Sequence, residues 1–383
     1  MQIVENEKKG KTRCACRQVY LDSLHMNYFI KEIINGDPNA GSKARNDVSA
    51  ILEGYGLTPL LLNFIHNEKD IDRKNRSLSE KVRENLQLRV EWRKRLKEVN
   101  CGDTVVVQFP IIRRPIFLTN EFKKLKRRGA HVVLLVHDLE VLRVIRRTDT
   151  GWLKKTRIRF EEITVMNDAD HIIVHNGSMK KHMIEMGFHQ EQLIELHIFD
   201  YLIPNFSIKE KNDHQNKDIV AIAGTLRVHK TKYLEQLPEN VVFHLYGVGY
   251  EDQGQKNIQY FGAFPPDELP MSMKAGFGLV WDGESSESCT GVYGEYLRIN
   301  NPHKTSLYLA AGIPVIIWKE AALADFVINE KCGLVINSLN EIHEAIANVS
   351  ADEYYEMKNN ALKISEKLRD GYYTINALKK IGL

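Results

Sequence analysis

Residues 296–318 carry the residue types of an anion-binding site. In this segment, YLRINNPHKTSLYLAAGIPVIIW, Asn301 can cap a helix that has Pro302 in its first position and ends at Gly312. The first turn of such a helix presents unpaired N–H groups, and Lys304 adds a positive charge to the same turn. The helix leads directly into a buried strand, and ligands of open α/β sheets bind where such helices begin. A well-capped packing helix with a solvent-exposed lysine is the structural alternative.

Groups that could transfer a proton follow two other apolar runs. His137 and Asp138 come directly after HVVLLV, and Glu284 follows GFGLVWDG. Because the carboxyl ends of parallel strands share one edge of a sheet, these side chains are expected to face a cleft. A base at that position could deprotonate an attacking hydroxyl group. Strand-end residues of these types also cap loops, which is the alternative interpretation.

Short β-rich runs alternate with helical patterns along almost the whole chain, which is typical of parallel sheets with crossover helices. The expected strands are 28–34, 57–64, 104–109, 131–136, 171–175, 193–198, 219–223, 241–246, 258–261, 276–281, 313–318 and 333–336. The expected helices are 43–55, with Ser42 as its cap, 77–98, 118–128, 155–166, 179–186, 351–369 and 374–380.

These elements predict an α/β protein of two domains, residues 26–203 and 219–369. A polar stretch that contains IKEKNDHQNK marks a linker at 204–218, and residues 1–25 form an N-terminal arm. The helix within 370–383 is expected to pack back on the first domain.

The composition is that of a globular protein: 43% of the 383 residues are hydrophobic and 27% are charged. No apolar run is long enough to span a bilayer, and no signal-peptide core follows the basic N-terminus, so a cytoplasmic location is expected. The five scattered cysteines fit reduced thiols. Basic residues gather at 123–128 and 143–159, either as solvated surface or for an anionic partner. Nucleic acid is disfavoured, because aromatic residues do not alternate with the basic ones.

The segment at 296–318 is similar to the donor-site signature of GT-B glycosyltransferases. Its form NNPHK-x-SLYLAAGIPVI resembles bacterial galactofuranosyltransferases and the glucosyltransferases that extend glycans on serine-rich-repeat adhesins. LLVHDLE at 134–140, AGTLR at 223–227, AGFGLVW at 275–281 and the SKAR-containing stretch 33–45 also match. The resemblance implies a GT-B fold, in which two Rossmann-like domains with parallel sheets face each other across a cleft. It also implies transfer of a hexosyl group, such as glucose, galactose or galactofuranose, from a UDP-sugar to a saccharide acceptor.

The resemblance assigns a set of donor-binding residues. They are Ser42, Arg227, Phe264, Tyr296, His303, Lys304 and Thr305. Ser42 would reach the phosphates from the N-terminal domain, Arg227 and Lys304 would neutralise the diphosphate from opposite sides, and Phe264 would lie beside the uracil. Such fixed positive groups stabilise the charge that develops on the leaving diphosphate.

The candidate catalytic residues are Asp138, His137 and Glu284, whose strand-end positions coincide with the cleft that the resemblance implies, and Glu284 could bind hydroxyls of the donor sugar. Many retaining GT-B enzymes carry a glutamate where this chain has Leu307, which favours inversion at the anomeric carbon. No metal or other cofactor is expected. Asp168 and Asp170 have D-x-D form but lie at a helix–strand junction, and a glycine pair at 247–249 lacks the rest of a dinucleotide fingerprint.

The expected partners are a UDP-sugar and a saccharide or glycoprotein acceptor, which could be anionic or lipid-linked. The basic segment 143–159 also contains apolar residues, so we expect it to flank the acceptor side of the cleft and to position an anionic or membrane-linked acceptor. Direct contact with the inner face of the membrane, a helix whose apolar residues pack inward and a subunit contact are the alternative interpretations. A homo-oligomer is expected too. The alternatives are a catalytically inactive GT-B subunit that stabilises another transferase, a Rossmann-type oxidoreductase and a nucleotide-sugar epimerase.

Overall fold

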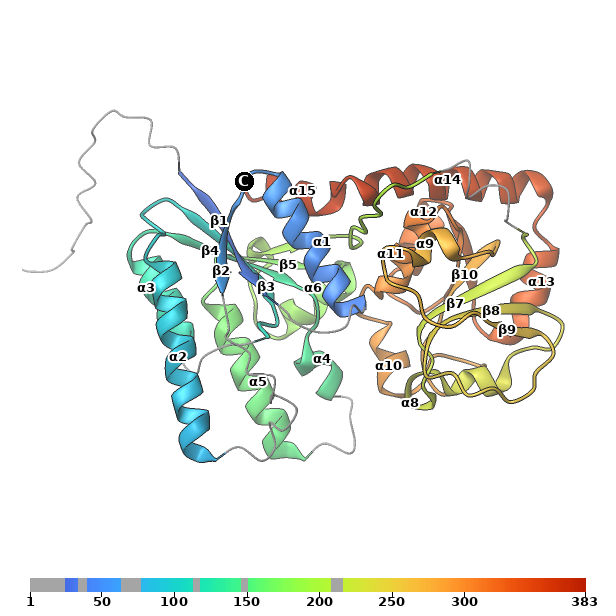
Figure 1. Ribbon diagram of the computed structural model, residues 1–383, viewed down its shortest axis with the longest axis horizontal. Coiled ribbons are helices and arrows are strands. Elements are labelled where there is room, and N and C mark those ends of the chain that lie inside the picture. Colours follow the sequence, from blue (N-terminus) through green and yellow to red (C-terminus); the bar gives the residue numbers. More distant parts are fainter. Residues whose placement is uncertain (1–24, 34–39, 63–76, 113–117, 146–150, 208–215) are drawn as a thin grey trace, which may run out of the picture.

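The chain forms two domains that each contain a parallel sheet of six strands (Figure 1). The structure, a computed structural model, describes residues 25–33, 40–62, 77–112, 118–145, 151–207 and 216–383. Most of the expected arm, residues 208–215 of the expected linker, and residues 146–150 of the basic segment therefore lie outside the described residues.

The N-terminal sheet has the strand order β2-β1-β3-β4-β5-β6. Its strands are β1 (Asn27–Glu32), β2 (Thr58–Leu62), β3 (Thr104–Phe109), β4 (His131–Val136), β5 (His171–Val174) and β6 (Leu193–Glu195). Its helices are α1 (Ala40–Gly54), α2 (Leu78–Leu96), α3 (Leu118–Arg127), α4 (Glu140–Ile145), α5 (Trp152–Asn167) and α6 (Gly177–Glu185). Val106 packs in the core on the α1 side, whereas Val105 and Val107 pack with α2 and α3 on the other face. This burial on both faces explains the continuous apolar runs.

The C-terminal sheet has the order β12-β11-β10-β7-β8-β9. Its strands are β7 (Ile219–Thr225), β8 (Val242–Val248), β9 (Ile258–Tyr260), β10 (Phe277–Val280), β11 (Val315–Trp318) and β12 (Gly333–Ile336). The helices around it are α8 (Val228–Thr231), α9 (Leu269–Ser272), α10 (Gly291–Tyr296), α11 (His303–Ala310), α12 (Ala324–Asn329), α13 (Ile342–Ala347) and α14 (Ala351–Arg369).

The last helix, α15 (Tyr372–Lys379), returns to the N-terminal domain and contacts α1 (Figure 1). Gly371 has a φ of 73° between α14 and α15, a left-handed conformation that glycine adopts without a steric penalty. Asp200 accepts hydrogen bonds from the backbone N–H groups of Tyr373 (3.1 Å) and Thr374 (2.7 Å) and so caps α15. The Tyr55 hydroxyl donates to the carbonyl of the terminal Leu383 (3.2 Å).

Two predicted helix starts are wrong. The helix α1 begins at Ala40, so Ser42 lies within its first turn rather than at its cap. The helix α11 begins at His303 and has only 8 residues, with Pro302 as its N-cap and no side-chain cap. Asn301, the predicted cap, directs its side chain to the other domain instead, as described below.

Candidate active site

Asn301 joins the two domains through hydrogen bonds at the carboxyl ends of β5 and β6. Its amide nitrogen donates to the carbonyls of His175 (2.8 Å) and His197 (3.0 Å), and its oxygen accepts from Nδ2 of Asn176 (2.7 Å). The backbone N–H of Asn301 also donates to Nδ1 of His175 (3.0 Å). The start of α11 is therefore fixed against the strand ends of the N-terminal domain.

Asp138 follows β4 and is surrounded by groups that stabilise a negative charge. Its carboxylate pairs with Nη1 of Arg143 (3.2 Å) and accepts from the backbone N–H of Leu139 (3.0 Å). The Tyr296 hydroxyl, from the other domain, accepts from the same Leu139 N–H (3.1 Å). Tyr296 was expected to bind the donor, and its hydroxyl contacts the residue that follows the candidate base in the other domain.

His137 is a neutral imidazole held in one orientation. The amide nitrogen of Gln108 donates to the Ser49 hydroxyl (2.9 Å). The amide oxygen of Gln108 therefore faces His137 and accepts from its Nε2 (2.6 Å). The His137 ring stacks on Phe199, with 5.3 Å between centroids. Burial lowers the pKa of His137 well below its usual value, and the positive charge of Arg45 adds to this effect. His137 is thus a weak base, and Asp138 is the better candidate to accept a proton.

The first turn of α11 places polar groups in the buried interface between the domains. His303 lies against Tyr201, with ring centroids 5.0 Å apart, and burial lowers its pKa to about 3. Within the described part of the chain, Nε2 of His303 and the buried hydroxyls of Thr305 and Ser306 have no hydrogen-bond partner. These unused groups lie beside Lys304, as a polar ligand would require.

Lys304 lies at the carboxyl end of β10. Its ammonium donates to the carbonyl of Trp281 (2.8 Å) and pairs with Asp282 (2.8 Å), and both charged side chains are nearly buried. Burial lowers the pKa of Lys304, and Asp282 opposes that change. An anion at this position would have to share Lys304 with Asp282.

The loops after β7 and β10 of the C-terminal domain meet each other. Gly283 donates its N–H to the Lys230 carbonyl (2.9 Å), which brings the loop of Arg227 beside that of Glu284. The exposed Arg227 side chain packs directly over Gly249. A Cβ atom at position 249 would overlap the Arg227 side chain. Glu284 is exposed, and its carboxylate packs closely over Gly291. A Cβ atom added at Gly291 would lie only 2.7 Å from that carboxylate.

Two further donor-set residues lie around this region. Phe264 is half-buried and packs on Tyr246, with ring centroids 6.1 Å apart.

Ser42 lies beside Lys43, a residue that was not predicted from the sequence to belong to the site. Lys43 is buried and pairs with Asp47 (2.6 Å) and with Asp267 of the other domain (2.7 Å), and it lies over the Tyr201 ring. The only sequence signal for this cation was its i, i+4 spacing to Asp47.

The D-x-D pair has structural partners. Asp170 pairs with Lys126 (3.0 Å) and accepts the N–H of Val132 (2.8 Å), while Asp168 lies 3.9 Å from Lys123. The described residues contain no group of three His, Cys, Asp or Glu side chains placed to hold a metal ion.

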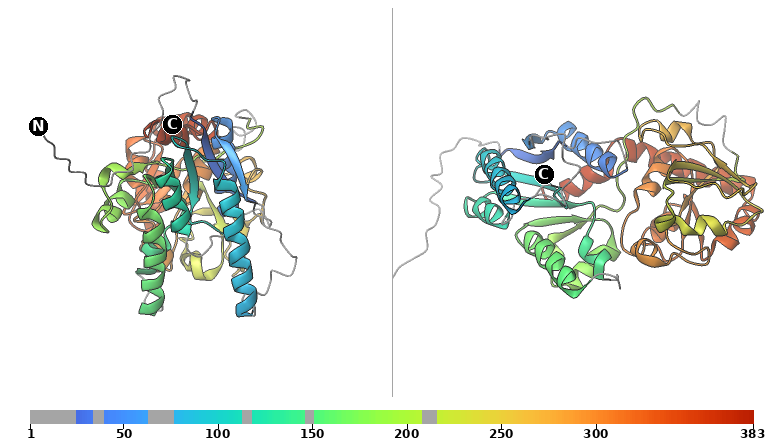
Figure 2. Two further views of the ribbon diagram at one scale, coloured as in Figure 1. Left: turned by 90° about the vertical axis from the view of Figure 1, so that its left-hand side faces the viewer. Right: turned by 60° about the horizontal axis from the view of Figure 1, so that its bottom comes forward.

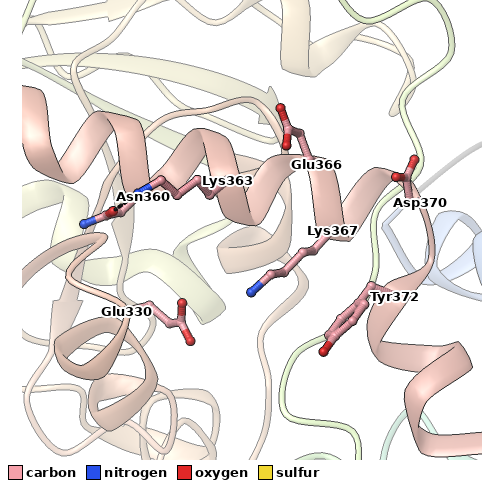
Figure 3. A pocket seen from close by; sticks show the side chains of 7 residues that line it. All are labelled: Glu330, Asn360, Lys363, Glu366, Lys367, Asp370 and Tyr372. Carbon is pink, nitrogen blue, oxygen red and sulfur yellow. Dashed lines mark hydrogen bonds between the residues drawn. The ribbon is translucent and has the colours of Figure 1, made fainter. Parts of the chain in front are cut away.

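A surface hollow of about 470 Å³ lies at the α14–α15 junction (Figure 3). It is lined by residues such as Lys363, Lys367 and Tyr372 and shares no residue with the candidate site.

Comparison with known proteins gives two family matches that together span most of the chain. Residues 27–198 match the profile "Glucosyltransferase 3-like, N-terminal domain", and residues 220–381 match "Glucosyltransferase 3-like, C-terminal domain".

Individual relatives match along nearly the whole chain. The β-1,6-galactofuranosyltransferase WbbI of Escherichia coli strain K12 is 29% identical over 92% of this chain and 98% of its own length. Glucosyltransferase 3 of Streptococcus gordonii is 25% identical over 88% of this chain and 92% of its own. A sucrose-phosphate synthase of Thermosynechococcus elongatus has a similar fold, with a TM-score of 0.56, 14% identity, and coverage of 93% of this chain and 97% of its own.

Proposed function

The chain belongs to the glucosyltransferase 3-like family of GT-B glycosyltransferases, and from this premise we propose that it transfers a hexosyl group from a UDP-sugar to a saccharide acceptor in bacterial surface glycan or glycoprotein assembly. The observation that carries the proposal is how the segment that leads into α11 meets the N-terminal domain. The Tyr296 hydroxyl accepts the N–H of Leu139, next to Asp138, and Asn301 donates to the carbonyls after β5 and β6. The helix turn that follows carries Lys304 and the unpartnered hydroxyls. An inactive partner subunit is not favoured, because the relatives that span nearly the whole chain are named as transferases.

Donor binding would use the loops of the C-terminal domain. Lys304 and Arg227 would meet the diphosphate, Thr305 and His303 would offer the polar groups that now lack partners, and Phe264 would lie near the uracil. The leaving UDP gains negative charge as the glycosidic bond breaks, and prearranged positive groups lower the energy of that transition state.

Asp138 would accept the proton of the acceptor hydroxyl as that oxygen attacks the anomeric carbon, giving inversion. His137, neutral and fixed by Gln108, would orient the substrate by hydrogen bonding. Glu284 would bind hydroxyls of the donor sugar from the loop after β10. Metal independence stays part of the proposal, and adding a chelator to the transfer assay tests it.

Thermal unfolding with nucleotides tests the donor site. UDP should stabilise the protein by roughly 2.7 kcal/mol at a hundredfold excess over its Kd, whereas ADP should give a smaller shift. Lys304→Ala should lose most of the UDP-dependent shift and transfer activity, and Lys256→Ala, at an exposed lysine of the same domain, should retain both. A larger shift with ADP, or normal turnover of Lys304→Ala, would contradict the assignment.

We also propose a cytoplasmic enzyme with peripheral membrane contact through α5. Trp152, Leu153 and Phe160 are 72%, 67% and 70% exposed, with Arg159 also exposed beside them, and α5 extends beyond its sheet together with α2 (Figure 2). Apolar and basic side chains together suit an anionic lipid surface, at about 1 kcal/mol for each cation. None of the helices in the described ranges has the length and apolarity to cross a bilayer.

Sedimentation with phosphatidylglycerol vesicles tests this contact. Trp152→Ser/Phe160→Ser should reduce the bound fraction several-fold, and Tyr355→Ser, on the exposed face of α14, should not. Equal binding of wild type, the double variant and Tyr355→Ser would contradict the membrane contact.

The expected homo-oligomer remains a proposal too. Its candidate surface is the exposed stripe Val82, Leu86 and Val90 on α2, and light scattering of Leu86→Glu measures it.

A further inference from the structure

We propose that Lys43 and Tyr201 of the N-terminal domain form a clamp on residues 264–267 of the C-terminal domain, the base loop, and thereby position Phe264 for the nucleotide base. The inference rests on the proposed function, because that function places Phe264 near the uracil. It adds two positioning residues from the opposite domain to the base subsite. The preference for one base would then depend on how the two domains meet.

Lys43 is fixed in its own domain and reaches the other domain with its remaining proton. Its ammonium donates to Oδ1 of Asp47 (2.6 Å) and to the carbonyl of Leu202 (2.7 Å), and Asp47 also accepts the N–H of Leu202 (3.1 Å). An ammonium has three protons, and the third is available to Oδ1 of Asp267 in the base loop, at 2.7 Å. Because the Lys43 side chain is only 7% exposed, packing restricts its movement, so this contact restrains Asp267 rather than Lys43.

Tyr201 holds the residue next to Asp267. Its hydroxyl donates to the carbonyl of Pro266 (2.7 Å), and its backbone N–H donates to the carbonyl of Leu368 in α14 (3.1 Å). Tyr201 is buried, and the Lys43 ammonium lies 4.9 Å from the centroid of its ring. Two consecutive residues of the base loop are therefore held by two buried side chains that contact each other.

The base loop is stiff enough to transmit this restraint. Its two prolines, Pro265 and Pro266, have a fixed φ, and the carbonyl of Pro265 accepts the N–H groups of Glu268 (3.0 Å) and Leu269 (3.0 Å). Phe264 directly precedes this turn, so a shift of Pro266 should move the Phe264 ring. The loop follows β9 and thus lies at the carboxyl edge of its sheet, where ligands of open α/β sheets bind.

The diphosphate site, by contrast, is held by contacts inside the C-terminal domain. Lys304 donates to the carbonyl of Trp281 and pairs with Asp282, both of its own domain. Tyr201 also touches α11, because its ring packs on His303, but removal of the hydroxyl leaves that ring in place. Loss of the polar contacts of the clamp should therefore weaken recognition of the base and leave the diphosphate contacts intact.

The substitutions Tyr201→Phe and Asp267→Asn test the clamp. The first removes the hydrogen bond to Pro266, the second removes the ion pair with Lys43, and both keep the shape of the side chain. Lys43 is left unchanged, since its loss would leave Asp47 buried without a cationic partner.

UDP and ADP are the probes, because they share the ribose and the diphosphate and differ only in the base. Calorimetric titration gives the Kd of UDP, and competition with UDP gives that of ADP. Tyr201→Phe/Asp267→Asn should raise the Kd of UDP at least fivefold and that of ADP less than twofold. Each single variant should show the same change in smaller measure, so the test does not depend on the folding of the double variant.

Two matched controls remove the same kinds of contact inside one domain. Tyr354→Phe removes a hydroxyl that donates to the carbonyl of Gly276 (3.1 Å), and Glu53→Gln removes an ion pair with Lys31 (2.8 Å). Both controls should keep the wild-type Kd values for UDP and ADP.

The outcomes separate the clamp from the proposed function. If wild type does not prefer UDP to ADP, the proposed function fails. If wild type prefers UDP but the double variant keeps the wild-type UDP Kd, or binds UDP and ADP more weakly by the same factor, the clamp does not position the base loop.

Discussion

Asp138 depends on a hydroxyl group that comes from the opposite domain. Tyr296 ends α10 of the C-terminal domain, yet its hydroxyl accepts the N–H of Leu139, which also donates to Asp138. This contact joins the two domains at the loop that follows β4. Tyr296 is therefore a positioning residue, which holds the loop that carries the Asp138 carboxylate.

Tyr296→Phe tests that role. Loss of the hydroxyl removes an acceptor of the Leu139 N–H, so the loop of Asp138 should be held less well and kcat should fall roughly tenfold with little change in the KM values. UDP-dependent stabilisation should be retained. Tyr293→Phe, on the same helix but packed on His229, should keep the wild-type kcat. A wild-type kcat in Tyr296→Phe would show that the Asp138 loop does not depend on this hydroxyl.

The position of α11 depends on a close approach between this helix and β10. Gly278 leaves space for the Tyr308 ring, which a Cβ would overlap, and the Tyr308 hydroxyl accepts the N–H of Ala223 (2.7 Å). Because α11 also carries Lys304, a change at Gly278 should affect both stability and donor binding.

Two Gly→Ala substitutions should therefore act in opposite directions. Gly278→Ala should destabilise the protein by about 1–3 kcal/mol through overpacking and weaken UDP binding. Gly54→Ala, at the end of α1 where a Cβ meets no atom within 4 Å, should stabilise it by about 0.5–1 kcal/mol. Urea unfolding measures both. Stabilisation by Gly278→Ala would mean that α11 and β10 are less closely packed than the structure has them.

Long or strongly apolar elements were predictable from the sequence. β3, β4, β12 and α14 have the predicted bounds, since a buried strand is a continuous apolar run and α14 shows several full helical periods. The helices α4, α10, α12 and α13 were missed. Each has six residues, less than two turns, which is too short for a periodic pattern to emerge. The GT-B fold and the glycosyltransferase family, which rested on the motif at 296–318, are confirmed.

The site was predictable only within each domain. His137 and Asp138 were found because they follow a buried strand, and Lys304 because it lies in a recognisable motif. The interdomain contacts of Asn301, Tyr296 and Lys43 were not found. They depend on how the domains meet, and local spacing along the chain contains no information about that arrangement. The assigned roles of the site residues stay predictions.

At the scale of the whole molecule, two buried histidines make the domain interface sensitive to acid. Burial lowers the pKa of His175 to about 4 and that of His303 to about 3, and both lie where the domains touch. Nδ1 of His175 accepts the N–H of Asn301, which a protonated ring nitrogen cannot do. The folded interface therefore contains His175 and His303 as neutral imidazoles.

The sign of the pH dependence follows from these values. In the unfolded chain histidine has a pKa of about 6.5, so between pH 6.5 and about pH 4 the unfolded state binds more protons than the folded state. The contribution of both histidines to stability is complete above pH 6.5 and is lost as the pH falls. Asp47, Glu162 and Asp200 act in the opposite direction, because burial raises their pKa to about 6, 7 and 7. A comparison of variants is needed to isolate the histidine term.

His303→Gln supplies that comparison, since glutamine remains neutral at every pH. Between pH 7 and pH 5, wild type should lose about 2 kcal/mol more unfolding free energy than His303→Gln, because that is the cost of keeping one ring unprotonated 1.5 pH units below 6.5. His343→Gln, at an exposed position on α13, should follow the wild-type curve. Urea unfolding at pH 7 and pH 5 gives the change in unfolding free energy of each protein. Comparing these changes removes any loss of stability that the substitution causes at both pH values. Parallel curves for wild type and His303→Gln would show that His303 is not enclosed by Tyr201 and Phe199 in solution, and hence that the domains do not close around it.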